Sequence, residues 1–266
     1  MSLLATYHNL NNLALWQQME RISLEQMRSV KLMNRIDTKY VASEEGVMQL
    51  LAEAAKCGYR VQVHGGVIAA RYDTRYFDTE LRDMYIAHHN RQLTRQKIRT
   101  RHYEDGSATY LEVKDKNNRG RTKKRRIEIP ANDLMGWMDN GEALSFLEPI
   151  SRYDVKSLTH AIATRFVRIT IVNPELTERI TLDLNLEFTD LRSGTTAQIE
   201  GMAIIEIKQD GNIRSKAKEI LNRLRVKPMR VSKYCLGTAL TVKDIKKNRM
   251  KEKIRRIEQR IKQNKQ

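Results

Sequence analysis

Charged and apolar residues alternate along several stretches of the chain, with the two-residue period of a β-strand that has one polar face. In "RIDTKYVAS" (35–43), Arg35, Asp37 and Lys39 share one face and Ile36 lies on the other. Tyr, Ile and Thr reinforce the strand signal in later stretches. The predicted strands cover residues 35–43, 71–79, 85–103, 109–116, 122–129, 164–172, 178–188 and 202–210.

Helical patterns are fewer and shorter. Ser43, followed by two glutamates, predicts a helix start, and Gly58 predicts its end. Further helices are predicted for residues 13–32, for about 132–139 after an Asn132 cap, for 216–225, and for the basic stretch after 243, which is either a helix or disordered. Strands follow one another through short turns instead of alternating with helices, so the pattern favours an α+β fold with an antiparallel sheet.

The polar faces of these strands are mostly basic. Lys97, Arg99 and Arg101 share one face, and the following strands repeat the pattern around the "NNRG" turn at 117–120. A face that is simply solvated is one interpretation, because antiparallel sheets often have one wet side. Like charges opposite each other destabilise a ladder, however, so the repetition favours a face that binds a polyanion.

Composition strengthens the case for an anionic ligand. The 266 residues carry a formal charge of +17, and a strongly basic protein attracts acidic partners. Residues 243–266 hold eleven Lys/Arg and three Asp/Glu, or +8, so the first 242 residues keep +9. The basic tail alone does not account for the charge.

Other classes of protein fit poorly. No stretch approaches the ~18 apolar residues of a membrane span, and the first twenty residues lack the pattern of a secretory signal. Cys57 and Cys235 are too few for a disulfide framework or a zinc site. We therefore expect a cytoplasmic protein, with the inner face of a membrane as a further location for an enzyme that delivers its product there.

A barrel would bring the basic faces together. If the sheet closes with its charged face inward, many buried cations need anionic partners. Phosphate oxygens bind Lys and Arg, and isolated carboxylates such as Glu112, Glu128, Asp183 and Glu206 suit a hard divalent metal. This combination points to phosphate chemistry in an enclosed channel.

The order of several short motifs resembles the VTC domain, the polyphosphate-polymerase branch of the triphosphate tunnel metalloenzymes, or CYTH-like superfamily. The resemblance covers about residues 30–240. Its motifs are "KY" (39–40), "YFDT" (76–79), "KIRTRHY" (97–103), "LEVKDK" (111–116), "KKRR" (123–126), "ERITLD" (178–183), "IIEIK" (204–208) and "SKY" (232–234).

The resemblance implies an antiparallel eight-stranded β-barrel tunnel with flanking helices, and a reaction in which a nucleoside triphosphate, ATP for example, extends a polyphosphate chain with Mn²⁺ or Mg²⁺. It implies three regions: an N-terminal helical segment (1–29), a VTC-like tunnel domain (30–242) and a basic C-terminal helix or disordered tail (243–266). The implied catalytic residues are Lys39, Arg99, Arg101, Lys114, Lys124, Arg126, Arg168 and Arg179. The implied substrate-binding residues are Lys208, Arg230, Ser232 and Lys233, and the implied metal ligand is Glu206.

One departure bears on the reaction. Hydrolytic members of the superfamily begin with Glu-x-Glu-x-Lys, where this chain has Arg35, Asp37 and Lys39. Loss of the first acid weakens a second metal site and favours phosphate gripping over hydrolysis. A tunnel triphosphatase and a non-catalytic module that binds polyphosphate or nucleic acid remain as alternatives, with nucleic acid the less favoured partner.

The adjacent histidines and the basic tail do not point to a specific function. His88 and His89 lie in a predicted strand, where neighbours point to opposite faces and cannot easily share a metal. The tail from Lys243 suits a solvated helix, a contact with an anionic membrane surface or a nucleic-acid arm. The pattern leaves these three open, together with the oligomeric state.

Overall fold

The computed structural model describes residues 6–28 and 35–263. Its strands are β1 (Arg21–Ser23), β2 (Arg35–Ser43), β3 (Arg60–Val63), β4 (Ala70–Asp78), β5 (Arg95–Tyr103), β6 (Ala108–Lys116), β7 (Thr122–Ile129), β8 (Thr159–Val172), β9 (Glu178–Asp190), β10 (Thr196–Gln198) and β11 (Met202–Asp210). Its helices are α1 (Tyr7–Asn11), α2 (Leu24–Arg28), α3 (Glu44–Lys56), α4 (Asp83–His89), α5 (Asp133–Gly136), α6 (Gly141–Leu147), α7 (Lys216–Arg223), α8 (Lys233–Thr241) and α9 (Asn248–Gln263).

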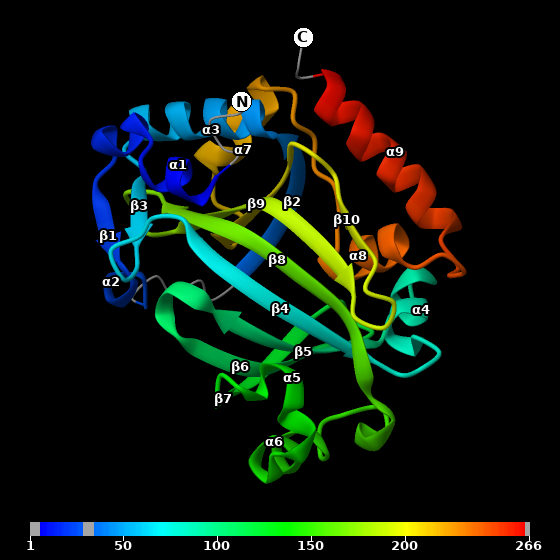
Figure 1. The fold of residues 1–266 in the computed structure, drawn as a ribbon. Coiled ribbons are helices and arrows are strands. Elements are labelled where there is room, and N and C mark those ends of the chain that lie inside the picture. Colours follow the sequence, from blue (N-terminus) through cyan, green and yellow to red (C-terminus); the bar gives the residue numbers. More distant parts are fainter. Residues whose placement is uncertain (1–5, 29–34, 264–266) are drawn as a thin grey trace.

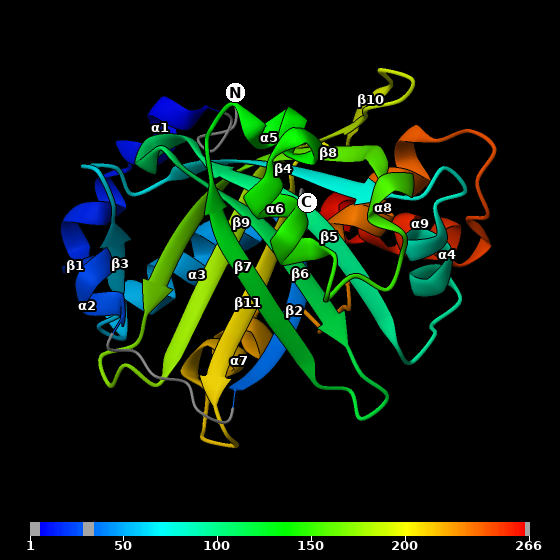
Figure 2. The ribbon, with the colours of Figure 1, turned by 90° about the horizontal axis from the view of Figure 1, so that it is seen from below.

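Eight strands form one curled antiparallel sheet in the order β2-β11-β9-β8-β4-β5-β6-β7. β2 and β7 are therefore the two edges of this order. Figure 1 shows β4, β8 and β9 running across the molecule, and Figure 2 shows β7 in front of β11 on the opposite side of the curl. The predicted α+β tunnel architecture is confirmed as a curled eight-stranded half-barrel with flanking helices.

Two apolar layers cover the outside of the curl. Ile180, Leu182 and Ile205 belong to a core that also contains Val47 and Leu50 of α3. The second layer packs Ile98, Leu111 and Val113 of β5 and β6 with Trp137 and Leu147 beneath α5 and α6. Figure 1 shows the two layers on opposite sides, with α3 and α7 above the sheet and α5 and α6 below it. The outward apolar face predicted from the alternation is thus the buried one.

α8 packs against the sheet and the start of α4. Tyr234 stacks on Tyr76 of β4 with ring centroids 5.0 Å apart, and its hydroxyl donates to Asp78. Asp78 is fully buried and also accepts from the backbone N–H groups of Met84 and Tyr85, at 2.9 Å each. One carboxylate therefore joins the end of β4, the start of α4 and the start of α8.

The basic C-terminal stretch forms a helix, one of its two predicted states. Met250, Ile257 and Ile261 of α9 are buried in the core that α8 shares. Arg249 Nη1 donates to the His89 carbonyl oxygen at 3.3 Å. Figure 1 shows α9 along one side of the molecule, close to α8 and β10. Within the described residues, no helix is long and apolar enough to cross a membrane.

Three sequence predictions of local structure are wrong. Residues 13–28 are not one helix, because Ile22 of β1 is buried against Val172 while β1 pairs in parallel with β3. The rest of that prediction, residues 29–32, lies outside the described residues. His88 and His89 lie in α4, not in a strand. Asn132 precedes α5 without a side-chain cap.

Candidate active site

The polar faces of the strands share the inside of the curl. Glu206 of β11 is directly opposite Lys39 of β2 and Thr181 of β9. On the other side of the curl, Arg99 of β5 is opposite Glu112 of β6. Residues directly opposite in an antiparallel ladder project from the same face. Since helices cover the apolar outer face, the charged residues of separate strands converge on one inner surface.

We call the inner face of β5, β6 and β7 the basic wall. Lys97, Lys114 and Lys124 stand in one cross-strand row, and the next row pairs Arg95 with Lys116. Such like-charged rows destabilise a sheet unless something neutralises them. The charged residues of the basic wall are Arg95, Lys97, Arg99, Arg101, Glu112, Lys114, Lys116, Lys124, Arg126 and Glu128.

We call the inner face of β2, β11, β9 and β8 the mixed wall. On β9 this face extends as far as the bulge at Asn185. Between β2 and β11 its rows pair opposite charges: Lys39 faces Glu206, and Asp37 faces Lys208, which is also opposite Arg179 of β9. Cross-strand pairs of opposite charge stabilise a sheet. The charged residues of the mixed wall are Arg35, Asp37, Lys39, Arg168, Arg179, Asp183, Glu206, Lys208 and Asp210.

Glu112 is the buried counterion of the basic wall. Its side chain is 0% exposed. Arg99 donates to it from Nε at 2.8 Å and from Nη2 at 2.5 Å, and Lys124 forms a second ion pair with it. Burial by itself would raise the pKa of Glu112, but the charges of Arg99, Arg101 and Lys124 hold that pKa well below its usual range. Glu112 therefore stays ionised and orients these cations.

Asp183 plays the same part on the mixed wall. Arg168 donates to it from Nε at 2.6 Å and from Nη2 at 2.8 Å, and Lys233 forms a close ion pair. Burial would raise the pKa of Asp183, and the Arg168 and Lys233 charges lower it well below normal. The pair with Lys233 also draws the first residue of α8 toward the inner surface.

Glu206 is held more loosely than Glu112 and Asp183. Its oxygens lie 3.6 Å from Lys39 Nζ and 3.3 Å from Lys208 Nζ, and 16% of its side chain is exposed. Among the described residues, no group of three His, Cys, Asp or Glu could hold a metal by protein ligands alone. Mg²⁺ typically binds through one or two carboxylates together with substrate phosphates and water. Glu206 therefore fits a divalent ion that arrives with a triphosphate.

Several lysines on the inner surface have pKa values near neutrality. Burial, which disfavours the charged form, lowers the pKa of Lys97 and of Lys208 to about 8 and that of Lys233 to about 7. The Arg99 charge, followed by burial, lowers the pKa of Lys114 well below its normal value. An anion among these ammonium groups would favour their charged forms, so anion binding and proton uptake are coupled.

Aromatic rings support the guanidinium groups between the two walls. Tyr72 of β4 lies 5.1 Å from Arg168 Cζ and 5.5 Å from Arg101 Cζ. Arg101 Nε also donates to Thr74 Oγ1 at 3.0 Å. Cation–π contacts and side-chain hydrogen bonds fix guanidinium groups that would otherwise rotate freely. The two arginines are therefore held in place before a ligand arrives.

The structure brings nearly all the predicted site residues to one place. The shared inner face carries Lys39, Arg99, Arg101, Lys114, Lys124, Arg126, Arg168, Arg179, Glu206 and Lys208. Ser232 caps α8 and accepts a hydrogen bond from Lys97 Nζ at 2.9 Å, and Lys233 begins the same helix. Arg230 differs because it is exposed in the segment before α8.

Sequence reasoning missed some contributors and misjudged two others. Lys97 shares the predicted face but was not among the predicted site residues, although the alternation itself identifies it. Glu112 and Asp183 looked suited to a metal, but both are fully engaged by Arg and Lys. Only the three-dimensional register reveals that engagement.

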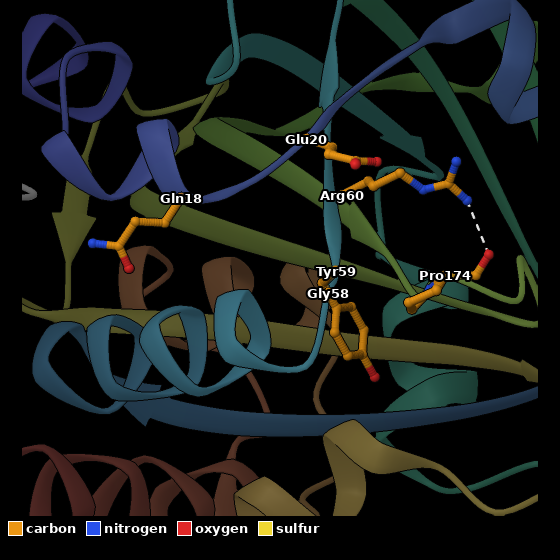
Figure 3. A pocket seen from close by; sticks show the side chains of 6 residues that line it. All are labelled: Gln18, Glu20, Gly58, Tyr59, Arg60 and Pro174. Carbon is orange, nitrogen blue, oxygen red and sulfur yellow. Dashed lines mark hydrogen bonds between the residues drawn. The ribbon is translucent and has the colours of Figure 1, made fainter.

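A surface pocket lies away from this inner face. Figure 3 shows it at the start of β3, where Arg60 donates to the Pro174 carbonyl oxygen at 3.0 Å. It is lined by Gln18, Glu20, Gly58, Tyr59, Arg60 and Pro174. It has none of the converging cations of the two walls, so we do not assign the chemistry to it.

Comparison with known proteins gives one family match. The VTC domain family matches residues 34–242. No curated protein gives a significant match to the chain.

Two solved structures are similar to the chain. A protein from Hippeastrum, described as a candidate adenylyl cyclase that reveals a dominant triphosphatase activity, is 16% identical, with a TM-score of 0.50 over 77% of this chain and 95% of that one. A protein from Bacillus halodurans, described as a candidate adenylate cyclase, is also 16% identical, with a TM-score of 0.48 over 75% and 96% of the two chains. At 16% identity, the similarity to the Hippeastrum protein concerns the fold alone.

Proposed function

The chain belongs to the VTC domain family, and on this premise we propose that it is a metal-dependent polyphosphate polymerase. It transfers the terminal phosphoryl group of a nucleoside triphosphate, most simply ATP, to the end of a polyphosphate chain. The observation that carries the proposal is the basic wall, in which eight lysines and arginines on three strands face only two acids. A repeating polyanion is a ligand that matches such a repeated arrangement of cations.

The reaction needs positioning and charge neutralisation more than covalent help. A terminal oxygen of the chain forms a bond to the γ-phosphorus, the bond from that phosphorus to the β-γ bridging oxygen breaks, and a nucleoside diphosphate leaves. The acceptor phosphate is already anionic, so no protein base is required. This accounts for a site rich in cations that does not depend on a histidine or cysteine nucleophile.

The roles of the residues follow from their partners. Arg99 and Arg168, each fixed by a buried carboxylate, would grip the phosphates beside the transferred group. Lys97, Lys114 and Lys124 would hold successive phosphates of the chain. Glu206 would hold Mg²⁺ or Mn²⁺, which when bound neutralises charge on the phosphate oxygens.

The start of β2 supports transfer over hydrolysis. Arg35 Nε lies 2.6 Å from Asp37 Oδ1, and its Nη2 donates to Asp37 Oδ2 at 3.1 Å. Arg35, which stands where the hydrolase motif has its first acid, thus forms an ion pair with Asp37, which stands where the motif has its second acid. An acid engaged in this way is a poor ligand for a second metal that would activate water.

Incubation of the purified protein with ATP and Mn²⁺, followed by sizing of the product on a gel, tests the proposal. We expect chains longer than triphosphate. Release of orthophosphate alone would identify a triphosphatase, and binding of polyphosphate without turnover would identify a binding module. Glu206→Gln should lower the rate of transfer by about 10²–10³-fold, the usual cost of losing one charge-stabilising group. Tripolyphosphate affinity without metal should be largely retained.

A further inference from the structure

The inner face of β5, β6 and β7 changes character along its length. Successive cross-strand rows on this face lie two residues apart, a step of about 7 Å. The row of three lysines and the row after it hold charged side chains only. The third row is Arg101, Tyr110 and Glu128, and the fourth pairs Tyr103 with Ala108. Cations therefore give way to tyrosines toward the end of β5.

Tyr72 of β4 joins these two tyrosines, so that three rings lie together on the inner face. The ring centroids of Tyr72 and Tyr103 are 4.8 Å apart, and those of Tyr103 and Tyr110 are 5.8 Å apart in an edge-on arrangement. All three residues are partly exposed, whereas Tyr76 and Tyr85 are buried in the core. We call Tyr72, Tyr103 and Tyr110 the tyrosine group.

Arginines of the inner face border the tyrosine group. The Cζ atoms of Arg101 and Arg168 lie 5.5 Å and 5.1 Å from the centroid of the Tyr72 ring. Arg126 Cζ lies 4.4 Å from the centroid of the Tyr110 ring. A ligand whose phosphates contact these guanidinium groups therefore places its adjoining part against the rings. In a nucleoside triphosphate that part is the nucleoside, because the phosphates occupy one end of the molecule.

The chemistry of the tyrosine group suits a base and not a phosphate. Phosphate oxygens bind best to charged N–H donors such as those of Arg and Lys. A base instead has a π-face, which stacks on aromatic side chains whatever the identity of the base. Ala108, directly opposite Tyr103, contributes only a methyl group to the same face. The partly exposed rings therefore have no bulky cross-strand neighbour at this end of the ladder.

We propose that the tyrosine group binds the base of the nucleoside triphosphate by stacking, while the neighbouring arginines hold its phosphates. This inference rests on the proposed function and specifies where the nucleoside of the substrate lies. It also gives the substrate a direction, because the triphosphate then extends from the tyrosine group toward the row of three lysines. Since stacking does not read the edges of a base, ATP and GTP should bind with similar affinity.

Binding measured without divalent metal isolates this site, because the proposed transfer needs a metal. Tyr103→Ala/Tyr110→Ala should weaken ATP binding by about 5- to 150-fold, the usual effect of removing a stacking partner. The same variant should bind inorganic tripolyphosphate within about twofold of wild type, because the phosphate-binding cations are intact. Isothermal titration calorimetry with both ligands gives the comparison.

Two controls separate stacking from other effects. Tyr103→Phe/Tyr110→Phe keeps both rings and should bind ATP as the wild-type protein does. Tyr153→Ala removes a partly exposed tyrosine near the other end of β5, where the Arg152 N–H donates to the Gln96 side chain, and should leave both affinities unchanged. Thermal unfolding of each variant near the wild-type midpoint confirms that it folds.

Three results would overturn the assignment of the tyrosine group. The first is unchanged ATP affinity in Tyr103→Ala/Tyr110→Ala, and the second is an equal loss for ATP and tripolyphosphate. The third is a loss of ATP affinity in the phenylalanine variant as large as that in the alanine variant. If the wild-type protein makes no polymer from ATP, the proposed function fails, but the calorimetry still decides the role of the tyrosine group because it requires no turnover.

Discussion

The basic wall and the mixed wall face the same interior but balance their charges differently. By register, the basic wall carries eight cations and two acids, and the mixed wall carries five cations and four acids. The mixed wall neutralises most of its charge within the protein and needs no ligand to do so. The basic wall has a charge excess that a ligand must neutralise. The mixed wall therefore holds its side chains in place through its own ion pairs, whereas the basic wall reaches charge balance only when a substrate binds.

The strongest test of this difference removes the one buried acid of the basic wall. Glu112→Gln leaves the buried Arg99 without its counterion and also removes the ion-pair partner of Lys124, whose side chain is 38% exposed. Loss of one partner of a buried ion pair costs about 3–5 kcal/mol. We expect that loss in the free energy of unfolding, measured with urea. Glu128→Gln, at an exposed position on the same wall, should change stability by less than about 0.5 kcal/mol. Equal stability of the two variants would show that Glu112 is not the counterion.

Ligand binding should stabilise the folded protein because it neutralises the basic wall. At a tripolyphosphate concentration of 100 times Kd, the free energy of unfolding should rise by about 2.7 kcal/mol. Differential scanning fluorimetry across a ligand series measures the shift. Arg99→Ala should reduce it more than Arg165→Ala, whose side chain is 53% exposed. Equal shifts in the two variants would contradict a site at the basic wall.

Removal of a cation should have opposite effects on the two walls. Lys114→Gln relieves repulsion within its row and should stabilise the ligand-free protein by about 0.2–1 kcal/mol. Lys39→Gln removes the partner of Glu206 and should be neutral or slightly destabilising. Urea unfolding of both variants without phosphate gives the comparison. Destabilisation by Lys114→Gln would show that its row is already neutralised within the protein.

The smallest expected effect is a shift in protonation. Lys233, Lys97 and Lys208 have lowered pKa values, about 7, 8 and 8, whereas an unfolded lysine stays protonated to about 10.4. Between about pH 7 and 10 the unfolded state binds more protons, so stability of the ligand-free protein rises with pH in this window. Polyphosphate favours the charged lysines, so its affinity should fall from pH 7 to pH 9.

Calorimetry can measure this coupling directly. Titration of tripolyphosphate at pH 7.5 in two buffers of different ionisation enthalpy should show uptake of up to about one proton for each ligand bound. A binding heat that is independent of the buffer would contradict the coupling.

Alternation along the chain was enough to predict the sheet and most of its inner face. β2 spans Arg35–Ser43 as predicted, and the set of Lys97, Arg99 and Arg101 lies where its period placed it. Alternation is a local property, so the sequence of a single strand is enough to predict which of its side chains share a face. The resemblance to a known family then predicted that the sheet curls around its charged face, which no local pattern contains.

The features that sequence missed depend on distant partners. The first turn of α4 is held by Asp78, whose carboxylate accepts from the N–H groups of Met84 and Tyr85 across a turn. Tyr85 and Ile86 favour strands, so the sequence pattern did not predict helix α4. Likewise, Glu112 and Asp183 are counterions because they lie opposite Arg99 and Arg168 on neighbouring strands, and neither arginine is adjacent to its acid in the chain.

The packing of α9 has a practical consequence for handling the protein. The family match ends at residue 242, so shortening the chain there would delete Met250, Ile257 and Ile261 from the core. The surface uncovered beside β2 and α8 would be apolar, and exposed apolar patches promote aggregation. A recombinant fragment trimmed to the recognised domain should therefore precipitate more readily than the 266-residue chain, and its loss of activity would say nothing about catalysis.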